Sequence, residues 1–132
     1  MSTQASCNCG DSGYNLVFAC SGAADVGAIS DRAARKLAAE KVAGMCCTAA
    51  IAARIPEILQ KTKGAAALVV LDGCEKECAR KVLEEAGFTA HAYVQLVRAG
   101  MEKGKTPASE ENTAKAAAWA TEALANAGSG RA

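Results

Sequence analysis

The chain has 132 residues and a formal net charge of +1; 51% of its residues are hydrophobic, but only 4% are aromatic. This length suits one domain, and no basic block or basic-aromatic interleaving indicates a nucleic-acid partner. No apolar run approaches the roughly 20 residues that span a bilayer, and the N-terminus lacks the basic and apolar regions of a signal peptide. The sequence therefore predicts a cytoplasmic protein that binds neither nucleic acid nor membrane.

Seven cysteines are many for a chain of this size. Cytosolic reductants keep thiols free, so a cysteine-rich cytosolic chain points to metal or redox chemistry rather than to structural disulfides. The odd number would also leave one thiol unpaired in any fully paired scheme. We therefore expect a thiol site.

Three regions differ in composition. Residues 1–13 are polar and predict a flexible leader that contains Cys7 and Cys9. Residues 14–128 predict a single α/β domain, and residues 129–132 form a short tail. The CxC spacing of Cys7 and Cys9 is compatible with a soft-metal or redox site. A leader without any site fits the sequence equally well.

Strands and helices alternate along the domain. Short apolar runs bounded by turn residues predict strands over 14–20, 41–47, 67–71 and 88–96. Helical periodicity predicts helices around 29–40, around 51–59 with a kink or a start at Pro56, over 75–86, and from Ser109 to about Ala127. This alternation predicts a doubly wound, Rossmann-like sheet of about four mostly parallel strands with helices on both faces.

Four cysteines follow the predicted strands. Cys20 ends the first strand, Cys47 ends the second, Cys74 lies just past the third, and Cys78 lies one turn into the next predicted helix. Because the carboxyl ends of parallel strands share one edge of a sheet, we expect these thiols to converge there. Cys74 and Cys78, four residues apart, would project from the same helical face.

Four converging thiolates match the tetrahedral sulfur coordination of a structural zinc ion. We therefore expect one Zn²⁺ held by Cys20, Cys47, Cys74 and Cys78, with an iron–sulfur cluster as the alternative for the same ligands. A helix starting after Cys74 would lower its thiol pKa. Asp72 could accept hydrogen bonds from backbone N–H groups of the Cys74 turn without binding the metal. Four protein ligands favour a binding role over a catalytic one, because catalytic zinc keeps one position open.

A family resemblance is carried by four strings. They are FACSGAADVG (18–27), CTAAIAARIPEIL (47–59), VVLDGCEKECARKVLEEAGF (69–88) and LVRAGMEKG (96–104). Together they resemble the DGC-domain family of proposed zinc-binding proteins, which is named for the tripeptide seen here as Asp72-Gly73-Cys74. The resemblance implies metal-ligand roles for the same four cysteines. It names a site and not a reaction.

Other thiol chemistries compete with zinc binding. In a redox or persulfide-transfer protein, Cys20 would be the nucleophile and Cys74 or Cys78 would resolve the intermediate. A phosphocysteine carrier would use Cys20 and the backbone of the following turn, but Asp25 would oppose phosphate there. A low-molecular-weight phosphatase needs an arginine six residues after its cysteine, where this chain has Val26.

The remaining notable residues predict structural roles. Cys46 is expected in the core. His91 is expected to have a structural role within a strand, with its ring nitrogens hydrogen-bonded. Lys103 and Lys105 are expected in a solvated loop. Trp119 and Leu124 predict the packing face of the last helix. No feature of the sequence indicates a protein partner.

Overall fold

The computed structural model describes residues 13–131, with side chains described up to residue 127. The predicted leader, with Cys7 and Cys9, therefore lies outside the described residues except for Gly13. Four parallel strands form one sheet in the order β2-β1-β3-β4. They are β1 (Asn15–Ala19), β2 (Gly44–Met45), β3 (Ala67–Asp72) and β4 (Ala92–Gln95).

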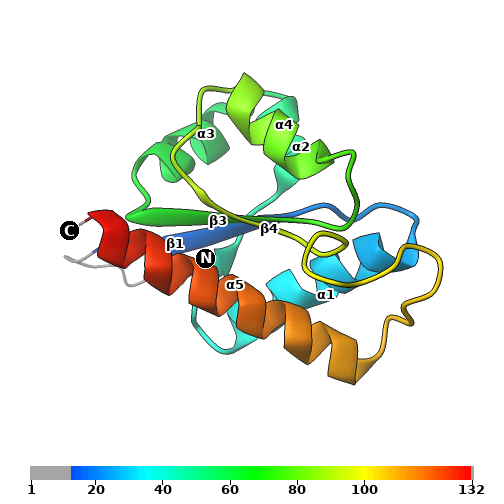
Figure 1. Ribbon diagram of the computed structural model, residues 1–132. Helices are drawn as coiled ribbons and strands as arrows, with labels where there is room; N and C mark the ends of the chain where they lie inside the picture. The colour runs from blue at the N-terminus through cyan, green and yellow to red at the C-terminus, as the bar shows by residue number, and fades with distance from the viewer. Residues whose placement is uncertain (1–12, 132) are drawn as a thin grey trace.

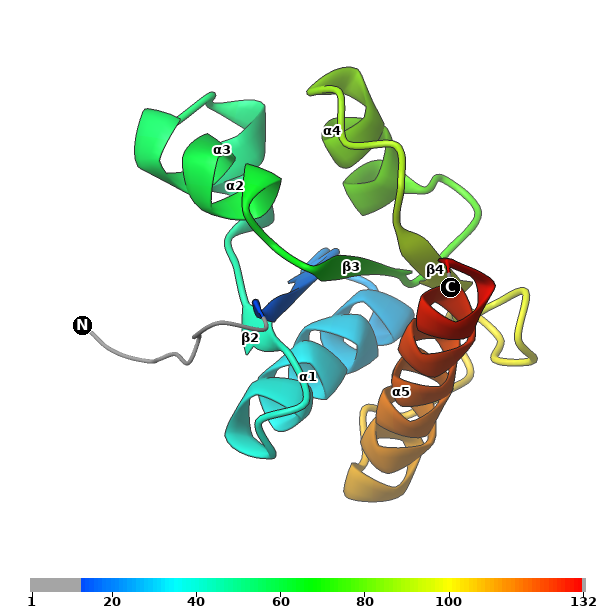
Figure 2. The ribbon, with the colours of Figure 1, turned by 90° about the vertical axis from the view of Figure 1, so that its left-hand side faces the viewer.

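Five helices connect and follow the strands. They are α1 (Asp25–Ala39), α2 (Thr48–Ala52), α3 (Pro56–Lys63), α4 (Cys78–Glu85) and α5 (Glu110–Arg131). Figures 1 and 2 show α1 and α5 on one face of the sheet and α2, α3 and α4 on the other. The predicted doubly wound α/β fold is confirmed, and of the two alternatives for Pro56 the structure has the helix start.

The central strands are buried on both faces because helices cover each face of the sheet. In β1, Leu16 and Phe18 belong to the core under α2 and α4, whereas Val17 and Ala19 belong to the core under α1 and α5. This alternation is the period-two pattern of a strand, and it explains why the sequence of β1 is a continuous apolar run.

The last helix packs along the α1 face. Ser109 caps it, since its hydroxyl accepts a hydrogen bond from the backbone N–H of Asn112 at 3.1 Å. Leu124 is buried and Trp119 packs against the same core, as expected. The helix continues to Arg131, so the predicted end near Ala127 is wrong.

Two other boundaries differ from prediction. The predicted strand over 41–47 is only two residues long, because Lys41 still belongs to the end of α1 through its left-handed backbone (φ 62°). The helix predicted from Glu75 begins at Cys78, and His91 precedes β4 rather than lying within it. No helix in the described part of the chain is long and apolar enough to cross a membrane.

Candidate functional site

Three of the predicted site cysteines follow three neighbouring strands. Cys20 comes directly after β1, Cys47 two residues after β2, and Cys74 two residues after β3. Because β1 lies between β2 and β3 and all three are parallel, the three loops leave the sheet at the same edge. The strand arrangement on which the site prediction depends is therefore confirmed.

Cys20 is half-buried, and the backbone N–H groups of Gly22 and Gly73 lie near enough to its sulfur to lower the thiol pKa. Burial raises the pKa of the Cys20 thiol, and the charges of Asp72 and Cys78 act in the same direction, while the two N–H groups oppose them. The Cys20 backbone N–H donates to the Leu71 carbonyl at 2.9 Å. The first cysteine is thus paired with the end of β3, just before the loop that carries Gly73 and Cys74.

Gly73 allows the close contact that brings these loops together. A Cβ atom on Gly73 would lie 2.7 Å from the Val26 carbonyl carbon and 2.8 Å from the Gly27 nitrogen. A Cβ on Gly27 would in turn lie 2.8 Å from the Gly22 oxygen. These neighbours are backbone atoms that cannot rotate away, so only glycine suits these positions. The glycine of the Asp-Gly-Cys tripeptide therefore packs the Cys74 loop onto the start of α1.

Asp72 fixes the start of α4 from a distance. Its carboxylate, in a residue that is 1% exposed, accepts hydrogen bonds from the N–H groups of Ala79 at 2.8 Å and Arg80 at 3.0 Å. The Tyr93 hydroxyl donates to the same carboxylate at 3.0 Å. Glu77, at the N-cap position, makes no side-chain cap, so Asp72 replaces the usual local cap.

This arrangement corrects two expectations. Asp72 accepts backbone hydrogen bonds, but from the first turn of α4 and not from the turn at Cys74. Cys74 lies in the loop before the helix while Cys78 is its first residue, so the two do not share a helical face. The physical reason is Glu77, whose left-handed backbone (φ 57°) separates the loop from the helix.

A polar network holds Glu77 and the start of α4 in place. The Glu77 carboxylate accepts a hydrogen bond from the Gln95 side chain at 3.0 Å and lies 3.6 Å from the Arg98 guanidinium. Arg80 lies over the Tyr93 ring, 4.7 Å from its centroid. Burial, followed by the charge of Asp72, raises the pKa of Tyr93 far above its usual range, so Tyr93 stays a hydrogen-bond donor.

Lys103 contacts the site, although the sequence predicts a solvated loop there. Its ammonium nitrogen lies 3.7 Å from the Cys74 sulfur. The loop is anchored by Asp25, the first residue of α1, whose carboxylate accepts N–H hydrogen bonds from Gly104 at 2.9 Å and Thr106 at 3.0 Å. These hydrogen bonds hold the pKa of Asp25 below its usual value. The spacing of residues along the sequence does not predict contacts such as these, between residues about eighty positions apart.

Cys46 and Cys47 have different surroundings. Cys46 is buried in the core under α2 and α4, as predicted, and burial raises its pKa. Cys47 is exposed at the start of α2. The Thr48 hydroxyl donates to the Ala19 carbonyl at 3.0 Å, which holds the start of α2 beside the end of β1.

The four thiols share one edge of the sheet but do not form a gathered coordination sphere. Among the residues that the structure describes, no three or more His, Cys, Asp or Glu side chains are placed together to hold a metal ion. The single histidine has a structural role: the His91 side chain is 3% exposed, and its Nε2 lies 3.2 Å from the Glu84 carboxylate. Zinc ligation by Cys20, Cys47, Cys74 and Cys78 stays a prediction.

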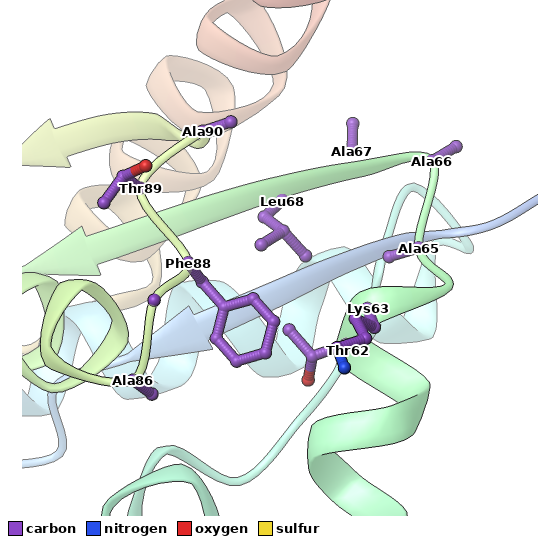
Figure 3. A pocket seen from close by; sticks show the side chains of 11 residues that line it. Thr62, Lys63, Ala65, Ala66, Ala67, Leu68, Ala86, Phe88, Thr89 and Ala90 are labelled. Carbon is purple, nitrogen blue, oxygen red and sulfur yellow. The ribbon is translucent and has the colours of Figure 1, made fainter.

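A hollow of about 530 Å³ lies at the opposite, amino end of the sheet. Figure 3 shows Phe88 and Thr62 on its two sides, with Leu68 at the start of β3 between them. Alanines line most of the rest. It holds no cysteine and is separate from the thiol site.

Comparison with known proteins supports the resemblance seen in the sequence. The model of the DGC domain family matches residues 16–120, from β1 into α5. The chain belongs to the DGC domain family. This DGC domain protein is also similar to the "Anaerobic and virulence modulator AnvM" of Pseudomonas aeruginosa, with 26% identity over 88 residues that cover 67% of each chain. No solved structure gives a significant match.

Proposed function

We propose that this DGC domain protein binds one zinc ion through Cys20, Cys47, Cys74 and Cys78. The observation that carries the proposal is the placement of cysteines after three adjacent parallel strands, with Cys78 at the start of the following helix. Four thiols form the donor set that structural zinc prefers.

The spacing of the strands is compatible with a shared ion. Neighbouring strands lie about 4.8 Å apart, whereas sulfurs around zinc, with Zn–S bonds of about 2.3 Å, lie roughly 4 Å apart. Cys20 occupies the middle position, and its backbone N–H donates to the Leu71 carbonyl near the end of β3 at 2.9 Å. Because the described thiols are not gathered around one point, zinc binding on this proposal requires the four cysteine side chains to come together.

Metal analysis of the full chain, purified without chelator, tests the proposal. We expect about one zinc per chain, and serine substitution of any of the four cysteines should lower this content. Cys46→Ala is the matched control, because Cys46 is a core residue next to a proposed ligand. A Cys7→Ser/Cys9→Ser double variant should also keep its zinc. A stable wild-type protein with no metal and four readily alkylated thiols would overturn the proposal.

The same purification separates zinc from an iron–sulfur cluster. A cluster on these cysteines would give a brown protein with visible absorption, whereas a zinc protein is colourless. A coloured protein that contains iron and sulfide would mean that the same cysteines hold an iron–sulfur cluster instead of zinc.

Thiol transfer is a second candidate function, because a second thiol lies in the neighbourhood of Cys20. Cys78 lies near enough for its charge to act on Cys20, although burial raises the pKa of the Cys20 thiol and so lowers the fraction present as thiolate. The Cys20 thiolate would attack a disulfide, form a mixed disulfide and release one thiolate. Cys78 would then attack Cys20 and release the second thiolate, leaving a Cys20–Cys78 disulfide and a reduced substrate.

Trapping distinguishes this function from zinc binding. The Cys78→Ser variant should accumulate a mixed disulfide at Cys20 with a small disulfide such as oxidised glutathione, and Cys20→Ser should form mixed disulfides more slowly than wild type. If neither variant differs from wild type in its rate of mixed-disulfide formation, this second function is excluded.

A further inference from the structure

We propose that the hollow at the amino end of the sheet binds a small monocarboxylate with an apolar body. Its volume of about 530 Å³ lies within the range of roughly 300–1,000 Å³ that small-molecule sites occupy. The hollow lies at the opposite end of the sheet from the cysteines. The proposal is therefore independent of metal binding and of thiol chemistry, and it stands or falls by itself.

A split between two strands opens the hollow. β3 pairs with β1 from its first residue, Ala67, but it pairs with β4 only from Val69, whose partner is Ala92. Ala67 and Leu68 therefore have no β4 residue beside them, and residues 86–90, which precede β4, line the other side of the hollow (Figure 3). The backbone paths of two loops form the hollow, so it does not depend on the rotation of one side chain.

The walls of the hollow offer an apolar surface that suits a ring or a short hydrocarbon chain. Figure 3 shows the Phe88 ring facing the hollow, with Leu68 behind it. Leu68 belongs to the core under α2 and α4, and Phe88 packs against the same core, so both walls are held in place. Small alanine side chains along both loops leave the space between them open. A flat apolar body would stack on the Phe88 ring.

Lys63 supplies the charge. Of the described residues that line the hollow, Lys63 alone is charged, and Figure 3 shows it next to Thr62, across from Phe88. In the part of the chain that the structure describes, Lys63 has no ion-pair partner. A cation without a counter-charge beside an apolar wall is complementary to an anion with an apolar body.

Lys63 is also not needed to end α3. Basic side chains near the end of a helix often bind its last carbonyl groups. Here the Gln60 carbonyl accepts a hydrogen bond from the Gly64 N–H at 3.1 Å. The Lys61 carbonyl accepts one from the Tyr14 hydroxyl at 2.7 Å. The Lys63 ammonium group is thus available to a ligand.

The Leu68 backbone N–H provides a second donor. The Leu71 carbonyl accepts a hydrogen bond from Cys20 on the β1 side of β3. The Asp72 carbonyl accepts one from Leu96 on the β4 side. Because the backbone groups of successive strand residues point to opposite neighbours, the Leu68 N–H points to the β4 side, one residue before the first β3–β4 pair. An ammonium group and an amide N–H together suit a carboxylate, which only accepts hydrogen bonds.

The ends of α3 and α4 limit the charge that the hollow accepts. Both helices end beside it, and the partial negative charge of a helix C-terminus opposes an anion. The last carbonyls already accept hydrogen bonds, as the Leu83 carbonyl does from the Phe88 N–H at 2.9 Å, whereas the Lys63 ammonium group can contact the ligand directly. We therefore expect a single carboxylate to bind and a dianion such as inorganic phosphate to bind more weakly.

NMR titration of the full chain with phenylacetate tests the proposal. The backbone amide signals of Leu68 and Thr89 should shift and saturate. 2-Phenylethanol, which has the same ring without the carboxylate, should bind wild type about tenfold more weakly, the effect of losing a hydrogen bond to a charged group. Inorganic phosphate should also bind more weakly than phenylacetate.

Lys63→Met should weaken phenylacetate binding about tenfold and leave 2-phenylethanol binding unchanged. Lys61→Met is the matched control, because Lys61 lies on the same helix and does not line the hollow; it should bind phenylacetate as wild type does. Phe88→Leu should weaken the binding of both probes, since both stack on the ring. Absence of saturable shifts at Leu68 and Thr89 would overturn the proposal, and so would equal phenylacetate binding by wild type and Lys63→Met.

Discussion

Gly73 lies where the loop after β3 touches the backbone at the start of α1. An alanine there would place its Cβ atom 2.7 Å from a backbone carbon of Val26, and neither backbone can move without disturbing the other. We expect Gly73→Ala to lower the free energy of unfolding by about 1–3 kcal/mol, measured by urea denaturation.

Gly44→Ala is the control for this substitution. A Cβ atom on Gly44 would lie 3.6 Å from the end of the Leu16 side chain and 3.9 Å from the Asn15 carbonyl oxygen, which are both ordinary contacts. The change in stability should stay within about 0.5 kcal/mol. Equal effects at the two glycines would contradict the close approach of the Cys74 loop to α1.

The buried Asp72 carboxylate accepts hydrogen bonds from three donors. Removing this carboxylate should therefore lower the free energy of unfolding more than removing one of the donors does. Asp72→Ala leaves the N–H groups of Ala79 and Arg80 without their acceptor. We expect a loss of stability on the order of 3 kcal/mol. Tyr93→Phe removes one hydroxyl and keeps the aromatic ring under Arg80, so it should cost about 1 kcal/mol. Chemical denaturation of both variants makes the comparison, and similar losses would show that the start of α4 finds another acceptor.

The individual residues of the site could be predicted only in part. The position of Cys74 beyond a strand follows from an apolar run that ends in Asp72-Gly73, and the buried state of Cys46 follows from its apolar neighbours. The contact of Lys103 with Cys74 could not be predicted, because it depends on the path of a loop that Asp25 fixes from another element. Sequence spacing places residues along strands and helices but not across loops.

At the scale of elements, three helices end in the same backbone motif with different residues. After α1, α2 and α4, the next turn is closed by paired hydrogen bonds around a residue with positive φ: Lys41, Arg54 and Gly87, respectively. This is the Schellman arrangement, which glycine adopts without strain. The sequence predicts the end of α4 at Gly87 for this reason, and the lysine at the end of α1 gives no such signal.

The strain at Lys41 predicts a stabilising substitution. An L-residue in the left-handed region costs roughly 1–2 kcal/mol, part of which glycine recovers because it lacks a Cβ atom. Lys41→Gly should therefore raise the free energy of unfolding by up to about 1 kcal/mol in urea. Gly87→Ala, the reverse change at φ 97° with open space around it, should lower it by a similar amount. A loss of stability in Lys41→Gly would mean that the lysine side chain stabilises the end of α1.

The contact between the β4–α5 loop and α1 predicts a pH effect. Hydrogen bonds from Gly104 and then Thr106 lower the pKa of Asp25 in the folded protein below the unfolded value of about 3.9. The resulting stabilisation is fully present above that value and is lost as the pH falls through the lower, folded pKa. Wild type should thus be more stable than Asp25→Asn at pH 7, and the difference should shrink below about pH 4. Urea denaturation across this range measures it, and a difference independent of pH would contradict the charged acceptor.

At the scale of the whole molecule, the alternation of apolar strands and amphipathic helices determines the doubly wound sheet. Runs such as the one in β3 are buried on both faces and leave little freedom in their assignment. The placement of the four thiols relative to one another could not be derived in the same way. Strand order brings the loops to one edge, but Glu77, Gly73 and Asp72 set how each loop turns after it leaves the strand.

Metal binding across these loops should stabilise the whole fold. Its ligands would come from the loops after β1, β2 and β3 and from the start of α4, so a bound ion would join four segments at this edge. A ligand that binds only the folded chain adds about 2.7 kcal/mol at one hundred times its Kd. This corresponds to an increase in the unfolding temperature on the order of 10 °C for a domain of this size. Calorimetry of chelator-treated protein with and without added zinc should show the increase in wild type and in Cys46→Ala, and no increase in Cys20→Ser/Cys74→Ser. An equal increase in the double variant would place the ion elsewhere on the chain.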